Sequence, residues 1–231
     1  MTTDGVLLYV CAAAVITCGL QVAVASAADD DPGPGSGSGE APPPVALLRT
    51  WRPPLPFAAL ALSVLMAGLA VAQNVFPGMV DALERHPGGS WWRAVTALGV
   101  QSSGWSQIVF NLAALVVVAP VAERRFGPWR MLLVFLVSGV AAQAVSMAGW
   151  SRTGGGDSVA VCGLVGALAG WYALRGVRPG ARRLAVVVPV AGVVLCLLAN
   201  NHGVGLVVGA ALGTVAGCDV RRGWSRSSPR P

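Results

Sequence analysis

Four polar side chains in otherwise apolar stretches have the types needed for acyl transfer. Cys162 provides a thiol, His202 an imidazole, and Gln107 and Asn111 two amides. Hydrolysis of an acyl group requires a nucleophile, a base within hydrogen-bond reach and neutral donors aimed at the developing oxyanion. An imidazole can take the proton of a thiol, and amides donate hydrogen bonds without carrying charge. We therefore predict Cys162 as nucleophile, His202 as base, and Asn111 with Gln107 as oxyanion donors.

Each of these residues also has a structural interpretation. A cysteine in an apolar helix usually packs as a small hydrophobic residue, and an asparagine in a membrane span often joins two helices. The positions favour the chemical interpretation. Gln107 and Asn111 are four residues apart and share a helix face, and Cys162 lies at about the depth of Asn111 if a helix rises about 1.5 Å per residue. All of the polar groups then fall in one leaflet.

The elements that must position these groups are membrane-spanning helices. Of the 231 residues, 55% are hydrophobic and 11% are charged, which is more apolar surface than a soluble domain of this size could bury. The apolar stretches reach about the 20 residues that cross a bilayer as a helix, and they lack the alternating polarity of a membrane β-barrel. We expect an all-α polytopic bundle. Its seven spans are predicted at residues 5–27, 55–77, 105–122, 130–150, 158–174, 184–200 and 202–218.

The chain divides into a single helix, a linker and a six-helix domain. Three aspartates, Asp29 to Asp31, are followed by a run of proline, glycine and serine up to Pro44, a composition that does not pack. We predict an N-terminal transmembrane helix at 1–28, a flexible cytoplasmic linker at 29–54, a six-helix membrane domain at 55–219 and a basic cytoplasmic tail at 220–231.

The arginines orient these helices. The chain has no lysine, and 13 of its 16 arginines fall on one side when the seven spans alternate in direction. By the positive-inside rule that side is the cytoplasm, so we expect a multi-pass protein of a bacterial plasma membrane with its C-terminus inside. The alternative is a cleaved signal peptide ending at Ala25-Ser26-Ala27, but cleavage would invert every later loop.

Composition argues against several other classes of function. The net charge of +6 comes from loop arginines that set orientation, so we expect no nucleic-acid partner. Two histidines, His86 and His202, are too few for a metal cluster in spans that lack carboxylates, so no metal site is predicted. The five cysteines lie in apolar segments and give no disulfide framework. A transporter would carry charged groups or broken helices at the midplane, whereas this polar cluster is shallow.

Glycine spacing predicts how two of the spans pack. The last span repeats a glycine every four residues, and the fifth span is also rich in glycine. Small residues on facing helices allow a close approach, which we expect to bring Cys162 and His202 together. Tight packing without chemistry would use the same glycines. They are Gly205, Gly209 and Gly213, with Gly163, Gly166 and Gly170.

The sequence resembles that of the rhomboid family over nearly all of residues 55–218. The likeness rests on five motifs in the family's order and spacing. The first is Trp92-Arg93 in a long first loop, and the second is Gln107 to Asn111, which stands in place of His-x-x-x-Asn. The third is Glu123 to Gly127, which matches Glu-x-x-x-Gly. The last two are Ala160-Val161-Cys162-Gly163, in place of Gly-x-Ser-Gly, and His202, Gly205 and Gly209, which match His-x-x-Gly-x-x-x-Gly.

The resemblance implies a rhomboid-like six-helix core and an intramembrane endopeptidase that cleaves transmembrane segments through a Ser-His dyad, without a cofactor. Carried onto this sequence, it puts Cys162 and His202 on the family's two dyad helices and adds Gly163 to the oxyanion donors. The partners it implies are transmembrane substrates or clients and the lipid bilayer. The sequence does not define an oligomeric state.

Four site positions depart from the family pattern. Cys162 replaces the serine, Ala160 the motif glycine, Gln107 the oxyanion-side histidine, and Gly166 the tyrosine four residues after the nucleophile. Sulfur is larger than oxygen, and a displacement of about 1 Å can cost roughly a hundredfold in rate. Two interpretations stay open, an active peptidase with a Cys-His dyad and an inactive pseudoprotease that binds transmembrane helices.

Overall fold

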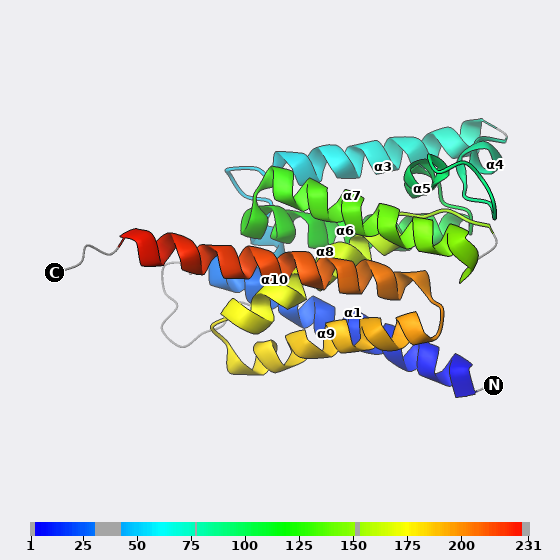
Figure 1. Ribbon diagram of the computed structural model, residues 1–231. Coiled ribbons are helices and arrows are strands. Elements are labelled where there is room, and N and C mark those ends of the chain that lie inside the picture. Colours follow the sequence, from blue (N-terminus) through cyan, green and yellow to red (C-terminus); the bar gives the residue numbers. More distant parts are fainter. Residues whose placement is uncertain (1–2, 31–42, 77, 151–152, 228–231) are drawn as a thin grey trace.

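The computed structural model describes residues 3–30, 43–76, 78–150 and 153–227, and these residues form a helical bundle (Figure 1). Ala97–Gly99 is a 3-10 turn (η1), and Ser146–Trp150 is a π-helical turn (η2) that continues α7. Within the described ranges no strand forms. The helices are α1 (Thr3–Asp30), α2 (Pro43–Arg49), α3 (Phe57–Val75), α4 (Met79–Leu83), α5 (Arg93–Thr96), α6 (Trp105–Phe126), α7 (Pro128–Val145), α8 (Ser158–Arg175), α9 (Pro179–Leu197) and α10 (Asn201–Ser227).

Seven of the described helices are long and apolar enough to cross a membrane, namely α1, α3, α6, α7 with η2, α8, α9 and α10. Their outward faces carry large apolar side chains, such as Val64, Leu133 and Val190, each more than half exposed. Apolar faces of this extent suit lipid rather than water. The predicted fold class, a six-helix core with one extra N-terminal helix, is confirmed.

The predicted linker and tail are partly helical. α1 continues to Asp30, and residues 43–49 form α2, because prolines suit a first helical turn and the apolar residues that follow pack on α1, where Ala46 is buried. Residues 31–42 of the predicted linker lie outside the described residues. At the other end α10 extends to Ser227, so the predicted tail begins within a helix, and residues 228–231 lie outside the described part.

α1 is packed into the bundle rather than standing apart. It runs along α9 and also contacts α8, α6 and α2 (Figure 1). At its C-terminal end the Asp29 carboxylate accepts a hydrogen bond from the Tyr172 hydroxyl at 2.8 Å and pairs with Arg178 at 3.2 Å. Asp30 pairs with Arg125 at 2.6 Å. Acidic residues are unfavourable at a helix C-terminus, and these partners offset that cost while tying α1 to the core.

α8 is the central helix, and α10 crosses it along a seam of glycines. A Cβ atom added to Gly205, Gly209 or Gly213 would lie 2.1, 1.9 or 2.0 Å from a backbone carbonyl oxygen of α8. A Cβ atom added to Gly166 or Gly170 of α8 would lie 2.2 or 2.3 Å from a carbonyl oxygen of α10. Because no side chain fits at these five positions, the predicted close contact between the two spans is present. We call these five residues the glycine seam.

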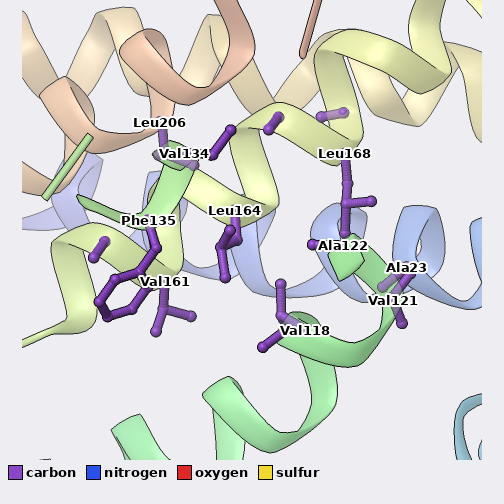
Figure 2. Close-up of a cluster of buried hydrophobic side chains, with 14 of the residues drawn as sticks. Ala23, Val118, Val121, Ala122, Val134, Phe135, Val161, Leu164, Leu168 and Leu206 are labelled. Carbon is purple, nitrogen blue, oxygen red and sulfur yellow. The ribbon is translucent and has the colours of Figure 1, made fainter. Parts of the chain in front are cut away.

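Apolar side chains fill the space between α8 and its other neighbours. Figure 2 shows Leu164 of α8 between Val118 of α6 and Phe135 of α7, with Leu206 of α10 close by. All four side chains are buried. Between membrane helices such van der Waals packing is a main source of association, and here it fixes where the first turn of α8 stands.

Candidate active site

A cavity of about 190 Å³ opens at the end of the bundle where α8 and α10 begin. Its walls come from the first turns of α6, α8 and α10 and from the loop that precedes α8. Gln107, Ser158 and His202 line it, together with Arg85 and Gln143. Two of the predicted chemical residues, Gln107 and His202, therefore share one cavity. Among the residues that the structure describes, no three His, Cys, Asp or Glu side chains gather as a metal site would require.

The imidazole of His202 is hydrogen-bonded at both ring nitrogens. Nδ1 lies 2.9 Å from Oδ1 of Asn200, and Nε2 lies 3.0 Å from Oγ of Ser158. The same Asn200 oxygen accepts the backbone N–H of His202 at 3.0 Å, so it is an acceptor. Nδ1 must then carry a proton, and in the neutral ring Nε2 keeps a lone pair that accepts the hydrogen of the Ser158 hydroxyl. In this tautomer the ring can act as a base toward the group at Nε2.

The turn between α9 and α10 places Asn200 for this contact. Ala199 adopts a left-handed backbone conformation (φ 53°), and the N–H groups of Ala199 and Asn200 donate to the carbonyls of Cys196 and Leu195. This pattern is the Schellman motif, which ends α9. Asn200 then caps α10, because its side-chain oxygen accepts the backbone N–H of His202. One side chain thus starts the helix and orients the ring.

Cys162 is partly exposed and lies one helical turn beyond Ser158 on the same face of α8. Both cysteine and histidine belong to the described residues, and no hydrogen bond joins the Cys162 sulfur to His202. Cys162 is also not among the residues that line the cavity. The side chain on Nε2 is instead Ser158, which the sequence did not single out. Its spacing of four from Cys162 was a signal, but a serine at a helix start also looks like a cap.

Asn111 is buried away from the cavity in a network around Asp157. Its amide nitrogen donates to Oε1 of Gln101 at 2.7 Å and to Oδ1 of Asp157 at 3.0 Å, and Gln101 donates to the same carboxyl oxygen at 2.6 Å. These contacts use both amide hydrogens of Asn111. Gln107 differs, because its Nε2 donates once, to the Gly155 carbonyl at 2.9 Å, and has a second hydrogen to offer at the cavity.

Asp157 gives the protein a testable pH dependence. The carboxyl is fully buried just before α8, and burial raises its pKa above the usual 3.8 despite hydrogen bonds from Gln101 and Asn111. A carboxyl whose pKa is higher in the folded state favours folding while it is protonated, so stability is lost as pH rises from 3.8 through the raised folded pKa. Asp157→Asn keeps an acceptor oxygen without the titration. The temperature of thermal unfolding in detergent should therefore change less between about pH 4 and about pH 8 for Asp157→Asn than for the wild type. Equally steep profiles for the two proteins would contradict this.

Comparison with known proteins assigns a family to this arrangement. The sequence model described as the Rhomboid domain matches residues 88–218, more than half of the chain. The chain belongs to the rhomboid family. It is 35% identical over 80 residues to "Rhomboid protease GluP" of Bacillus subtilis and 28% identical over 102 residues to "Rhomboid protease AarA" of Providencia stuartii. These alignments cover 35% and 38% of the chain, but only 16% and 36% of the two rhomboid relatives.

Glu123 and Gly127, two residues on which the predicted family resemblance rests, organise the end of the bundle opposite the cavity. Glu123 accepts the backbone N–H groups of Ala58 and Ala59 at 3.2 and 2.6 Å, and so caps α3 with a buried carboxylate. Gly127 takes a positive φ of 84° between α6 and α7, where a glycine is favoured. Both residues therefore hold in place the helices that carry the site, and neither of them lies in the site.

Trp92 and Arg93, also singled out by the predicted family resemblance, brace the long first loop. The Arg93 guanidinium lies 4.9 Å from the centre of the Trp92 ring and donates to the carbonyl of Glu84 at 2.5 Å. Arg93 also donates to the carbonyl of Asp81 at 3.3 Å. These contacts join α4 to α5, which packs on α7.

Gly163, a predicted oxyanion donor, occupies a packing position. It lies inside α8, so its N–H belongs to the helix ladder. A Cβ atom at Gly163 would lie 1.7 Å from Oγ of Ser138 on α7, while its carbonyl oxygen faces Gly209 of α10. In this rhomboid chain Gly163 lets three helices meet at α8.

Proposed function

We propose that the chain is a rhomboid-type intramembrane endopeptidase that hydrolyses peptide bonds in transmembrane segments of other proteins. The observation that carries the proposal is the state of His202, whose Nε2 lone pair is directed at a side-chain hydroxyl beside a cavity in a membrane bundle. Membership of the rhomboid family supports the same class of reaction, because the curated relatives are named as rhomboid proteases.

The residues around the cavity can be given parts in hydrolysis. His202 takes the proton of the attacking group and returns it to the leaving amine. Gln107 offers the second hydrogen of its amide to the oxyanion. Asn200 keeps the ring in the tautomer that accepts at Nε2. No cofactor takes part in this proposed sequence.

The proposal includes an orientation in the membrane. Four arginines, Arg124, Arg125, Arg175 and Arg178, lie near the helix ends opposite the cavity, on the side where α10 ends (Figure 1). By the positive-inside rule that side is cytoplasmic, which puts the cavity near the external surface. A transmembrane substrate would then present its external portion to His202.

The second candidate is a rhomboid pseudoprotease that binds transmembrane helices without cutting them. The observation that favours it is Cys162, which takes the motif position of the nucleophile but makes no hydrogen bond with His202 in the described structure. If Cys162 were the only residue able to attack a substrate carbonyl, the protein would be inactive, because its thiol has no hydrogen bond to a base among the described residues.

The two candidates are separated by a cleavage assay on the full chain. The chain and a single-span substrate labelled at both ends are reconstituted in the same liposomes, and the products are measured by mass spectrometry. We expect a cut within or next to the span, and no cut with His202→Ala at unchanged thermal stability. A substrate that can be crosslinked to the bundle but stays intact would establish the binding protein. Equal cleavage by His202→Ala would reject the proposed site.

A further inference from the structure

We propose that Ser158, rather than Cys162, is the nucleophile of this site, and that Asn200 completes a Ser158-His202-Asn200 triad. The inference rests on the proposed function, because it names the attacking group of the same reaction. It departs from the motif comparison, in which the nucleophile position falls on Cys162.

The contacts of Ser158 are those of an activated nucleophile. Such a group lies about 2.6–3.2 Å from its base, and the base is oriented by a third group. Oγ of Ser158 is 3.0 Å from Nε2 of His202, and Oδ1 of Asn200 is 2.9 Å from Nδ1. Because the Asn200 oxygen can only accept, both bonds run in one direction, from the hydroxyl to the ring and from the ring to the amide. The base is therefore already directed at the hydroxyl.

Position along α8 also favours Ser158 over Cys162. Ser158 lines the cavity together with Gln107 and His202, whereas Cys162 does not. The two residues are one turn apart, about 6 Å along the helix axis. An imidazole whose Nε2 accepts the Ser158 hydroxyl cannot take the thiol proton at the same time. In this arrangement Cys162 is a packing residue.

The first turn of α8 supplies neutral donors around the Ser158 hydroxyl. The backbone N–H groups of Ser158 and Val159 precede the helical ladder, and neither donates a hydrogen bond to any described residue. The 18-residue helix directs the positive end of its dipole at the same point. Together with the remaining amide hydrogen of Gln107, these groups can bind an oxyanion formed on the substrate carbonyl.

The reaction balances with water as the only co-reactant. Ser158 Oγ bonds to the scissile carbonyl carbon while its proton moves to Nε2 of His202. The C–N bond then breaks, and the Nε2 proton leaves with the amine, giving an acyl ester on Ser158. A water molecule passes a proton to Nε2 and attacks the ester carbon. The C–Oγ bond breaks, Ser158 regains the proton from Nε2, and the second product leaves as a carboxylic acid.

The first test is covalent labelling, which needs no substrate. The full chain in detergent is treated with a fluorophosphonate probe, which phosphonylates activated serine hydroxyls with loss of fluoride, and the modified peptide is identified by mass spectrometry. We expect the adduct on Ser158 in the wild type and in Cys162→Ala, and at least a tenfold loss of labelling in His202→Ala. A folded wild-type protein with no adduct on Ser158 would overturn the proposal.

The second test is cleavage of the two-label substrate in liposomes by matched variants. Ser158→Ala should lower the cleavage rate about 10³-fold or more, while Cys162→Ala retains most of it. Ser158→Ala removes the hydrogen bond to the His202 ring as well as the hydroxyl. Ser158→Thr is therefore the conservative variant, because it keeps a hydroxyl and should retain part of the cleavage rate. Loss of cleavage in Cys162→Ala with activity kept in Ser158→Ala would overturn the inference.

The outcomes separate this inference from the proposed function. Cleavage that depends on Cys162 would support the proposed peptidase activity and reject Ser158 as its nucleophile. Labelling of Ser158 without cleavage of any transmembrane substrate would support the activated hydroxyl and reject the intramembrane peptidase.

Discussion

Asn200→Ala is expected to lower the rate of peptide cleavage by about 10²- to 10⁴-fold. The Asn200 oxygen fixes the proton on Nδ1 of His202, and without it the ring can take the tautomer that donates from Nε2 and cannot act as a base there. The measurement is the cleavage rate of the transmembrane substrate in liposomes, made beside a thermal unfolding curve of each variant.

Two further substitutions separate ring orientation from helix capping at Asn200. Asn200→Asp keeps an acceptor oxygen for both the ring and the backbone N–H of His202, so it should restore most of the rate. Asn200→Ser still caps α10, but its hydroxyl is one bond shorter toward the ring, so stability should be kept while the rate stays low. A loss of rate that follows thermal stability across the three variants would show that Asn200 is only a cap.

Gly209→Ala is expected to destabilise the bundle by about 3 kcal/mol or more. The added Cβ atom would lie 1.9 Å from the backbone oxygen of Gly163, and a backbone atom inside a helix cannot rotate away. α10 must therefore move off α8, which also separates His202 from Ser158. Unfolding in detergent should show the loss, and cleavage should fall with it.

Gly68→Ala in α3 is the matched control for the glycine seam. Its added Cβ atom meets nothing within 4 Å, so only the helical preference for alanine over glycine acts, worth about 0.5–1 kcal/mol in favour of the folded state. If Gly209→Ala and Gly68→Ala unfolded at the same temperature, that result would contradict the close approach of α8 and α10.

Hydrophobicity was sufficient to predict the membrane bundle. The seven spans and the glycine contact follow from length, apolar content and four-residue spacing, which are properties of single segments. Helix ends were harder, because they depend on partners. α1 reaches Asp30 because Arg125 and Arg178 receive the two aspartates, and neither arginine is near them in sequence.

The candidate site was predicted in outline and differs in its contacts. His202 and Gln107 share a cavity, as their common leaflet suggested. Asn111 faces Asp157 and Gln101 instead, since a buried carboxyl competes for amide hydrogens and the sequence does not show which pair will meet. Ser158 was missed because a hydroxyl at a helix start has an ordinary local explanation, and only the turn at Ala199 and Asn200 brings the imidazole to it.

The docking of α1 has a consequence for the order in which the protein assembles. The partners of Asp29 come 143 and 149 residues later in the chain, on α8 and just before α9. During synthesis α1 therefore enters the bilayer well before the surface that receives it exists. Asp30 can meet Arg125 once α6 is made, but Asp29 lacks both of its partners until the hairpin of α8 and α9 is inserted, so α1 reaches its final place only after helices that are made later than it.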